Sequence, residues 1–195
     1  MSSNTFLPKD AALRAIGRTV VNFQRLEHNL KLAVRLGTFQ GTVPKIQRDL
    51  ARRVEWATTL TLGQAIQAWL SAAQSESSDT TVHTPDLFDT TMQVTFSWGA
   101  DAESQDAHGQ ALKALLEARN NLIHGGLVQM QWDSPAECER LIGRLNELND
   151  SIATQMEFVT SILQARDSIR PQDLEAEYLE AERRTSQEAP SAGDA

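Results

Sequence analysis

The sequence predicts an all-α protein: an antiparallel helical bundle of four to five helices with a small two-stranded appendage. Three observations lead to this fold class. Apolar residues recur three and four positions apart over several long stretches, which places them on one face of a helix. Proline, glycine and capping residues separate these stretches. Only two short runs alternate between apolar and polar residues, as strands do.

The first helix is expected from Pro8 to about Gly37. Proline fits the first turn of a helix because its missing N–H would have no partner there. The apolar face of this helix is formed by Leu13, Ile16, Val20, Phe23, Leu30 and Val34. Arg18 and Arg25 fall on the opposite face, which is expected to meet solvent.

A second helical region is expected over residues 45–73, with a break around 58–63. The stretch that follows, 74–87, is rich in Ser, Thr, Asp and Gln and is typical of a loop. Residues 91–98 then alternate between polar and apolar side chains, which predicts a short strand.

The third helix is expected from Asp101 to His124, and residues 128–132 alternate again. Because the two alternating runs flank this helix in sequence, the strands at 91–98 and 128–132 are expected to pair with each other. They would form the two-stranded appendage of the bundle.

The last helix has the clearest start. Ser134 is a capping residue, Pro135 occupies the first turn, and Glu137 stands three residues after the serine. An apolar stripe then begins at Cys138 and continues until Pro171 ends the helix.

Two regions follow from this reading. Residues 1–170 form a helical domain, and residues 171–195 form an acidic, largely flexible C-terminal tail, because they are poor in large apolar groups. No uninterrupted apolar run is long enough to span a bilayer, and the first ten residues lack the apolar core of a signal peptide. A cytoplasmic location and no membrane partner are therefore expected.

The net charge of −8 is unevenly distributed. Residues 1–60 carry +6, residues 61–169 carry −10 and residues 170–195 carry −4. The basic N-terminal part can therefore meet an anionic polymer although the protein as a whole is acidic. The single cysteine, Cys138, excludes an internal disulfide and a cysteine-rich zinc site.

One segment stands apart from this scaffold: Arg119-Asn120-Asn121-Leu122-Ile123-His124-Gly125-Gly126, at the predicted end of the third helix. An arginine presents a fixed charge and a fork of donors that fits phosphate oxygens. A histidine changes charge near neutral pH and can accept or donate a proton. Glycine lets a helix end and lets backbone approach a ligand closely. The segment therefore predicts phosphate chemistry that needs no metal and no other cofactor.

The geometry of this segment leaves two arrangements open. Asn120 and His124 are four residues apart and share a helix face, whereas Arg119 and His124 are about 140° apart around an ideal helix. The arginine and the histidine converge more easily if the helix unwinds at Gly125. They also converge if a second copy of the chain brings its own segment across a two-fold axis, which hints at a site shared between subunits.

The run Arg119-Asn120-Asn121-Leu122-Ile123-His124-Gly125 resembles the motif of the HEPN superfamily, the higher eukaryotes and prokaryotes nucleotide-binding domains. These domains are helical bundles in which an arginine, a polar residue (often asparagine) and a histidine lie near a helix end. The matching residues are Arg119, Asn120 and His124, and the helical plan over 8–168 also fits. Many HEPN proteins are metal-independent endoribonucleases that act as dimers, often as toxins of toxin–antitoxin or anti-phage systems. Others are non-catalytic binding modules.

The resemblance implies cleavage of RNA to 2′,3′-cyclic phosphate and 5′-hydroxyl ends. His124 would act as the base or the acid, and Arg119 would hold the phosphate and stabilise its developing charge. Asn120 would orient the histidine or donate to a phosphate oxygen. The partners that the resemblance implies are RNA, a second copy of the chain with the active site at the interface, and an antitoxin or regulatory protein.

Other residues are expected to support the site. Glu27 interrupts the apolar stripe of the first helix, and a carboxylate there needs a partner, so a contact between Glu27 and Arg119 is predicted. Asn121 supplies a second amide beside the motif. Basic residues of the N-terminal part can follow a phosphate backbone. The candidate RNA-binding residues are Arg18, Arg25, Arg48 and Arg52.

Structural explanations stand beside these functional ones. Arg119 can pair with a carboxylate inside the bundle, and the helix dipole alone favours a histidine at a helix C-terminus. A non-catalytic helical module that binds protein or nucleotide is therefore an alternative to a ribonuclease, and a plain structural dimer is a third. His108 is expected to pack or cap, and Cys138 to be a buried thiol.

Overall fold

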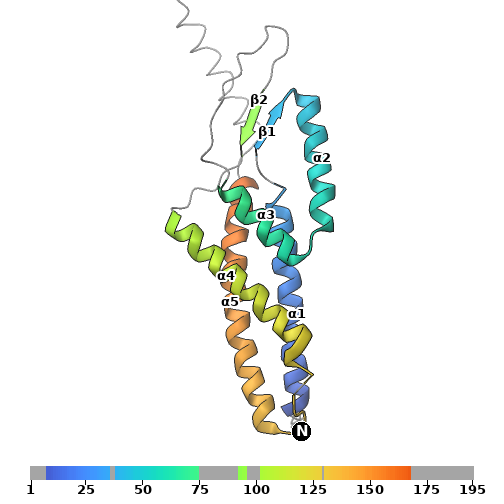
Figure 1. Cartoon of the computed structure of the whole chain (residues 1–195), viewed down its shortest axis with the longest axis vertical. Helices are drawn as coiled ribbons and strands as arrows, with labels where there is room; N and C mark the ends of the chain where they lie inside the picture. The colour runs from blue at the N-terminus through green and yellow to red at the C-terminus, as the bar shows by residue number, and fades with distance from the viewer. Residues whose placement is uncertain (1–7, 36–37, 75–91, 96–101, 129, 168–195) are drawn as a thin grey trace, which may run out of the picture.

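The computed structural model describes residues 8–35, 38–74, 92–95, 102–128 and 130–167, and the expectations for the loop at 75–87 and the tail at 171–195 lie outside them. The described part is mainly helical, as the sequence predicts (Figure 1). Its α-helices are α1 (Pro8–Ala33), α2 (Val43–Thr59), α3 (Leu62–Gln74), α4 (Ala102–Asn121) and α5 (Pro135–Asp167). A π-helical turn, η2 (Leu122–Gly126), continues α4. None of the described helices combines the length and the apolar character needed to cross a lipid bilayer.

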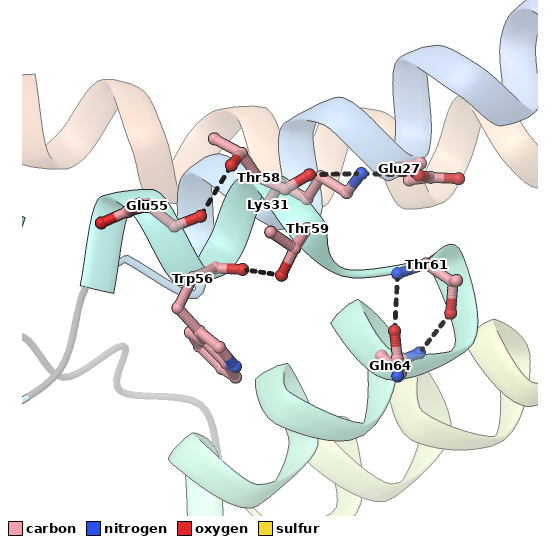
Figure 2. Close-up of polar contacts among 8 residues, drawn as sticks. All are labelled: Glu27, Lys31, Glu55, Trp56, Thr58, Thr59, Thr61 and Gln64. Atoms are coloured by element: carbon pink, nitrogen blue, oxygen red, sulfur yellow. Dashed lines mark hydrogen bonds and ion pairs between the residues drawn. The ribbon is translucent and has the colours of Figure 1, made fainter. Parts of the chain in front are cut away.

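Local capping explains where two of the helices begin. At the start of α5 the backbone N–H of Glu137 donates to Ser134 Oγ at 3.4 Å. At the start of α3, Thr61 and Gln64 cap each other: the Thr61 N–H donates to Gln64 Oε1 at 2.9 Å, and the Gln64 N–H donates to Thr61 Oγ1 at 3.4 Å (Figure 2). The predicted break between the second and third helical segments is therefore confirmed.

The end of α2 is held to α1 by one lysine. Lys31 Nζ donates to the carbonyl oxygen of Thr58 at 3.4 Å and forms an ion pair with Glu27 Oε1 at 2.7 Å (Figure 2). A cation is favoured beside the carbonyl groups that end a helix. This contact places α2 against the C-terminal half of α1.

The two-stranded appendage predicted from residues 91–98 and 128–132 does not form. Strand β2 (Met92–Thr95) pairs instead with β1 (Thr38–Gly41), antiparallel. After η2 the chain closes a turn in which the Ser134 N–H donates to the Gln131 carbonyl at 3.0 Å. Met130 and Trp132 pack partly buried against the core there. Both apolar side chains therefore cover the core next to the start of α5 and belong to no strand.

Helices α1 and α5 run in the same direction and make the most extensive helix–helix contact. Near the start of both helices, Ala15 shares a cluster with Leu141. Near their ends, Asn29 Nδ2 donates to Thr160 Oγ1 at 3.2 Å. The chain reverses direction from one helix to the next, so the fifth helix returns parallel to the first (Figure 1).

Helix α4 runs antiparallel to α5. His108, near the start of α4, lies 3.1 Å (Nδ1 to Oε1) from Gln155, and its ring stacks on Phe158 with the centroids 3.4 Å apart. At the other end of α4, Leu122 packs in a cluster with Leu141. The packing role expected for His108 is confirmed.

A buried polar network joins the middle of α1 to the middle of α5. Thr19 is fully buried, and its hydroxyl donates to the Ala15 carbonyl at 2.9 Å. Asn149 Nδ2 donates to Thr19 Oγ1 at 2.9 Å and to the Leu145 carbonyl at 2.7 Å. Asn22 Nδ2 in turn donates to Asn149 Oδ1 at 2.8 Å. Because buried polar groups must find partners, this network fixes the register of the two helices.

The network separates two apolar clusters. The cluster around the end of α4 consists of Ala12, Ala15, Leu122, Cys138, Leu141 and Leu145. The larger cluster on the other side includes Phe23, Leu26 and Leu30 of α1, Ile152 and Val159 of α5, and residues of α3 and α4. Cys138 is fully buried and free, as expected.

Replacing Asn149 with alanine is expected to lower the free energy of unfolding by about 1–3 kcal/mol, because Asn22 loses its acceptor in a partly buried position. Asn146→Ala is the matched control: Asn146 is exposed and bonds only to Arg18 within the described residues. Urea unfolding followed by circular dichroism compares the two. A loss of equal size in both variants would contradict a structural role for the network.

Candidate functional site

The segment singled out by the sequence occupies the end of α4 and the whole of η2. Backbone hydrogen bonds in a π-helix join residues five apart, so the turn holds one residue more than an α-helical turn, and such turns are frequent at functional sites. A Cβ on Gly126 would lie 3.1 Å from the carbonyl oxygen of Asn121, five residues back in the same turn. A Cβ on Gly125 would meet no atom within 4 Å. Of the two glycines, Gly126 is therefore the one with a close backbone neighbour.

This turn decides how the arginine and the histidine are related. The helix does not unwind at Gly125; it widens over Leu122–Gly126. With more residues per turn, the angle between Arg119 and His124 falls below the ~140° of an ideal α-helix. Arg119 is half-buried, and His124 is exposed. The two functional groups are therefore on more similar faces than regular helix geometry would give.

The amide of Asn120 contacts the arginine rather than the histidine. Arg119 Nη1 donates to Asn120 Oδ1 at 3.2 Å. The imidazole of His124 makes no hydrogen bond or ion pair with any part of the chain that the structure describes. Asn120 thus positions the guanidinium, and the imidazole is open to a partner from outside the chain.

Leu122 anchors the segment to the bundle. It is buried against Ala12 and Ala15 of α1 and against Leu141 of α5. Figure 1 shows the end of α4 crossing near the end of the bundle where α1 and α5 begin. The motif consequently lies at that end of the bundle, on a helix that Leu122 anchors to the core rather than on a loop.

Two large apolar side chains next to the motif face solvent. Ile123 is 44% exposed and Val128 is 83% exposed, and both flank His124 in sequence. Val128 is the most exposed of the large apolar side chains in the described ranges. Asn121 is also exposed. The residues around His124 are therefore open to solvent.

The predicted contact between Glu27 and Arg119 does not form. Glu27 pairs with Lys31, one turn along the same helix, and Arg119 bonds to its neighbour in sequence. The reason is distance along α1. Leu122, three residues after Arg119, shares an apolar cluster with Ala15, and Glu27 lies about 18 Å beyond Ala15 along α1 at ~1.5 Å per residue.

The candidate RNA-binding arginines fall into two groups. Arg18 and Arg25 lie exposed on α1, where Arg18 donates to Asn146 of α5. Arg48 and Arg52 lie exposed on α2, which packs against the other half of α1 from the one that meets the end of α4. The structure therefore does not bring Arg48 and Arg52 together with the motif.

An open pocket of about 440 Å³ borders the π turn. It is lined by Gly126 of η2, by Met130, and by Glu137, Arg140 and Arg144 of α5. The two arginines are four residues apart and share a face of the helix. The pocket thus joins the end of the motif to a basic stretch of α5.

Sequence reasoning missed Arg140 and Arg144. The net charge of −10 over residues 61–169 directed attention to the basic N-terminal part instead. The available signal was the four-residue spacing of two arginines on a strongly patterned helix. What the sequence did not reveal is that the turn after the motif folds back onto this helix.

The site combines a half-buried guanidinium, an exposed imidazole and a neighbouring pocket with two further arginines. Within the described ranges, no group of three His, Cys, Asp or Glu side chains is arranged to hold a metal ion. No protein-family model, no curated protein and no solved structure matches this chain. Chemically, the arrangement can bind a phosphate group and move a proton beside it.

Gly126→Ala is expected to be less stable than Gly125→Ala, because the added Cβ would meet the Asn121 carbonyl oxygen at 3.1 Å and the turn must shift by a few tenths of an ångström. Gly125→Ala, the control next to it, meets open space and is expected to be neutral or to stabilise by about 0.4–1 kcal/mol. Thermal and urea unfolding measure both. If the two variants lose stability equally, close packing at Gly126 is not what sustains the turn.

Proposed function

We propose that this protein is a metal-independent endoribonuclease of the HEPN type that cleaves RNA to 2′,3′-cyclic phosphate and 5′-hydroxyl ends. The observation that carries the proposal is the π turn η2, which reduces the angle between Arg119 and His124 and leaves the imidazole exposed. The resemblance of Arg119, Asn120 and His124 to the HEPN motif supports the same reaction.

The reaction needs only groups that this segment offers. A base removes the proton from the ribose 2′-hydroxyl, and the 2′-oxygen attacks the adjacent phosphorus. The bond from phosphorus to the 5′-oxygen breaks, and an acid delivers a proton to that oxygen. DNA is not a substrate because it lacks the 2′-hydroxyl.

Each residue of the motif has a role in this proposal. His124 is the proton-transfer group. Arg119 binds the non-bridging phosphate oxygens and stabilises the charge that develops on them. Asn120 is a positioning residue, because its amide oxygen holds the guanidinium at 3.2 Å. Asn121 supplies a second, exposed amide beside the motif.

A homodimer completes the site in this proposal. The reaction requires a base at one oxygen and an acid at another, and each copy of the motif provides one imidazole. A two-fold axis that brings the two motifs face to face supplies both. The exposed Ile123 and Val128 provide apolar surface for that contact. In a cell, such an enzyme acts as a toxin or anti-phage effector held in check by an antitoxin or regulatory protein.

His124→Ala is expected to slow RNA cleavage in EDTA at least about 100-fold, because the proton-transfer group is lost. His28→Ala is the control, since His28 is an exposed histidine on α1 far from the motif. Gel analysis of a labelled RNA, with chemical identification of the ends, measures rate and product together. An unchanged cleavage pattern in His124→Ala would sink the proposal.

Mixed dimers test the shared site. If both imidazoles act on one phosphate, wild type and His124→Ala refolded together at equal amounts are expected to retain about a quarter of the wild-type activity, because only dimers of two wild-type chains are active. If each chain instead carried a complete active site of its own, the mixture would retain about half of the wild-type activity. Size-exclusion chromatography with light scattering establishes that the dimers have formed.

The non-catalytic binding module is the second candidate, and one observation favours it. Nothing in the described part of the chain orients the imidazole of His124, while Ile123 and Val128 beside it are exposed. In that case the folded wild-type protein cuts no RNA, and its expression slows growth no more than expression of His124→Ala does. Slower growth with wild type alone favours the nuclease.

A further inference from the structure

The pocket beside the π turn contains arginines to which the proposed chemistry gives no role. Gly126 forms the side nearest the motif, and Arg140 and Arg144 contribute from α5. Arg144 is exposed and makes no hydrogen bond or ion pair within the described ranges. An unpaired guanidinium at a pocket wall is a ready partner for an anion, and phosphate oxygens match its fork of donors.

Arg140 is only weakly engaged by the protein. Its Nε donates to the Ala136 carbonyl at 3.2 Å, and its Nη2 lies 3.8 Å from Glu137 Oε1. The Arg140 side chain is 71% exposed, and ion pairs of this length in solvent contribute little. The second carboxylate oxygen of Glu137 accepts from the Gln131 N–H at 3.0 Å. This bond ties Glu137 to the turn before α5, and one carboxylate leaves a net positive charge beside two arginines.

The size of the pocket indicates more than a bare phosphate. A volume of about 440 Å³ lies within the range of small-molecule sites. Met130 adds an apolar surface to the lining. A phosphate at the two arginines therefore leaves space for an attached sugar or base against the methionine.

We propose that this pocket binds the nucleotide unit of single-stranded RNA next to the phosphate that is cut, with its phosphate held by Arg140 and Arg144 and its sugar or base against Met130. The inference rests on the proposed ribonuclease function, since it places this subsite beside the reacting phosphate. The subsite sets the register of the strand, because it grips a phosphate at a fixed position relative to His124.

The test separates binding from cleavage. A fluorescent 12-nucleotide RNA with every 2′-hydroxyl methylated cannot be cut and reports binding alone by anisotropy in EDTA. Arg140→Ala/Arg144→Ala is expected to weaken binding about 25-fold at 0.1 M salt and to reduce the slope of log affinity against log salt by about 1.4, for two phosphate contacts on a single strand. Glu137→Gln is expected to strengthen binding, because it removes the negative charge and keeps an acceptor for Gln131.

Lys113→Ala is the charge control, because Lys113 is exposed on α4 and does not line this pocket. It is expected to change affinity less than twofold. Circular dichroism checks that each variant is folded. Binding by the double arginine variant equal to that of the control overturns the subsite, as does a wild-type protein that does not bind the oligonucleotide.

Failure of the subsite and failure of the nuclease give different results. If wild type leaves unmodified RNA intact but loses binding in Arg140→Ala/Arg144→Ala, the pocket holds nucleotides and the nuclease proposal falls. If wild type cuts RNA and the double variant binds and cuts as well as wild type, the nuclease stands and the subsite is overturned.

Discussion

The hydrogen bond between Asn149 and Thr19 is the constraint on which the rest of this structure depends. It lies between two apolar clusters and joins helices that run parallel, so no short connection sets their register. Apolar side chains alone tolerate sliding of one helix past another, whereas a buried amide and hydroxyl must meet at one position. With that register fixed, the starts of α1 and α5 form a single platform. The end of α4 packs on this platform through Leu122.

Periodicity was sufficient to predict the helices because their apolar faces and their caps agree. The start at Pro135 and the break between α2 and α3 rest on local hydrogen bonds that a few residues encode. Strand pairing and helix direction are different, because they depend on contacts between distant segments. β2 has β1 as its partner, and Met130 and Trp132 cover the core. An alternating run of five residues does not show whether the segment pairs with a particular strand or packs against the core.

For the candidate site, too, local features could be predicted from the sequence and contacts between distant segments could not. Residue types and spacing single out Arg119, Asn120 and His124 as candidates, because such chemistry can be proposed without a fold. The partner of Glu27 was mispredicted because a break in an apolar stripe shows that a partner is needed and does not say where it lies. Lys31, one turn away on the same helix, forms the ion pair with Glu27. Arg144 was overlooked because its position depends on how the chain returns after η2.

The π turn η2 contains one residue more than an α-helical turn, and the position of this surplus residue determines the direction in which the His124 imidazole points. In a π turn the backbone N–H bonds to the carbonyl five residues back instead of four, which leaves one surplus residue in the helix. Each residue position by which the surplus is displaced rotates the side chains it passes by roughly 100° about the helix axis. Leu122 on one side and the cap at Ser134 on the other confine that rotation to the short stretch between them. The direction of the imidazole therefore depends on where in the helix the surplus residue of η2 lies.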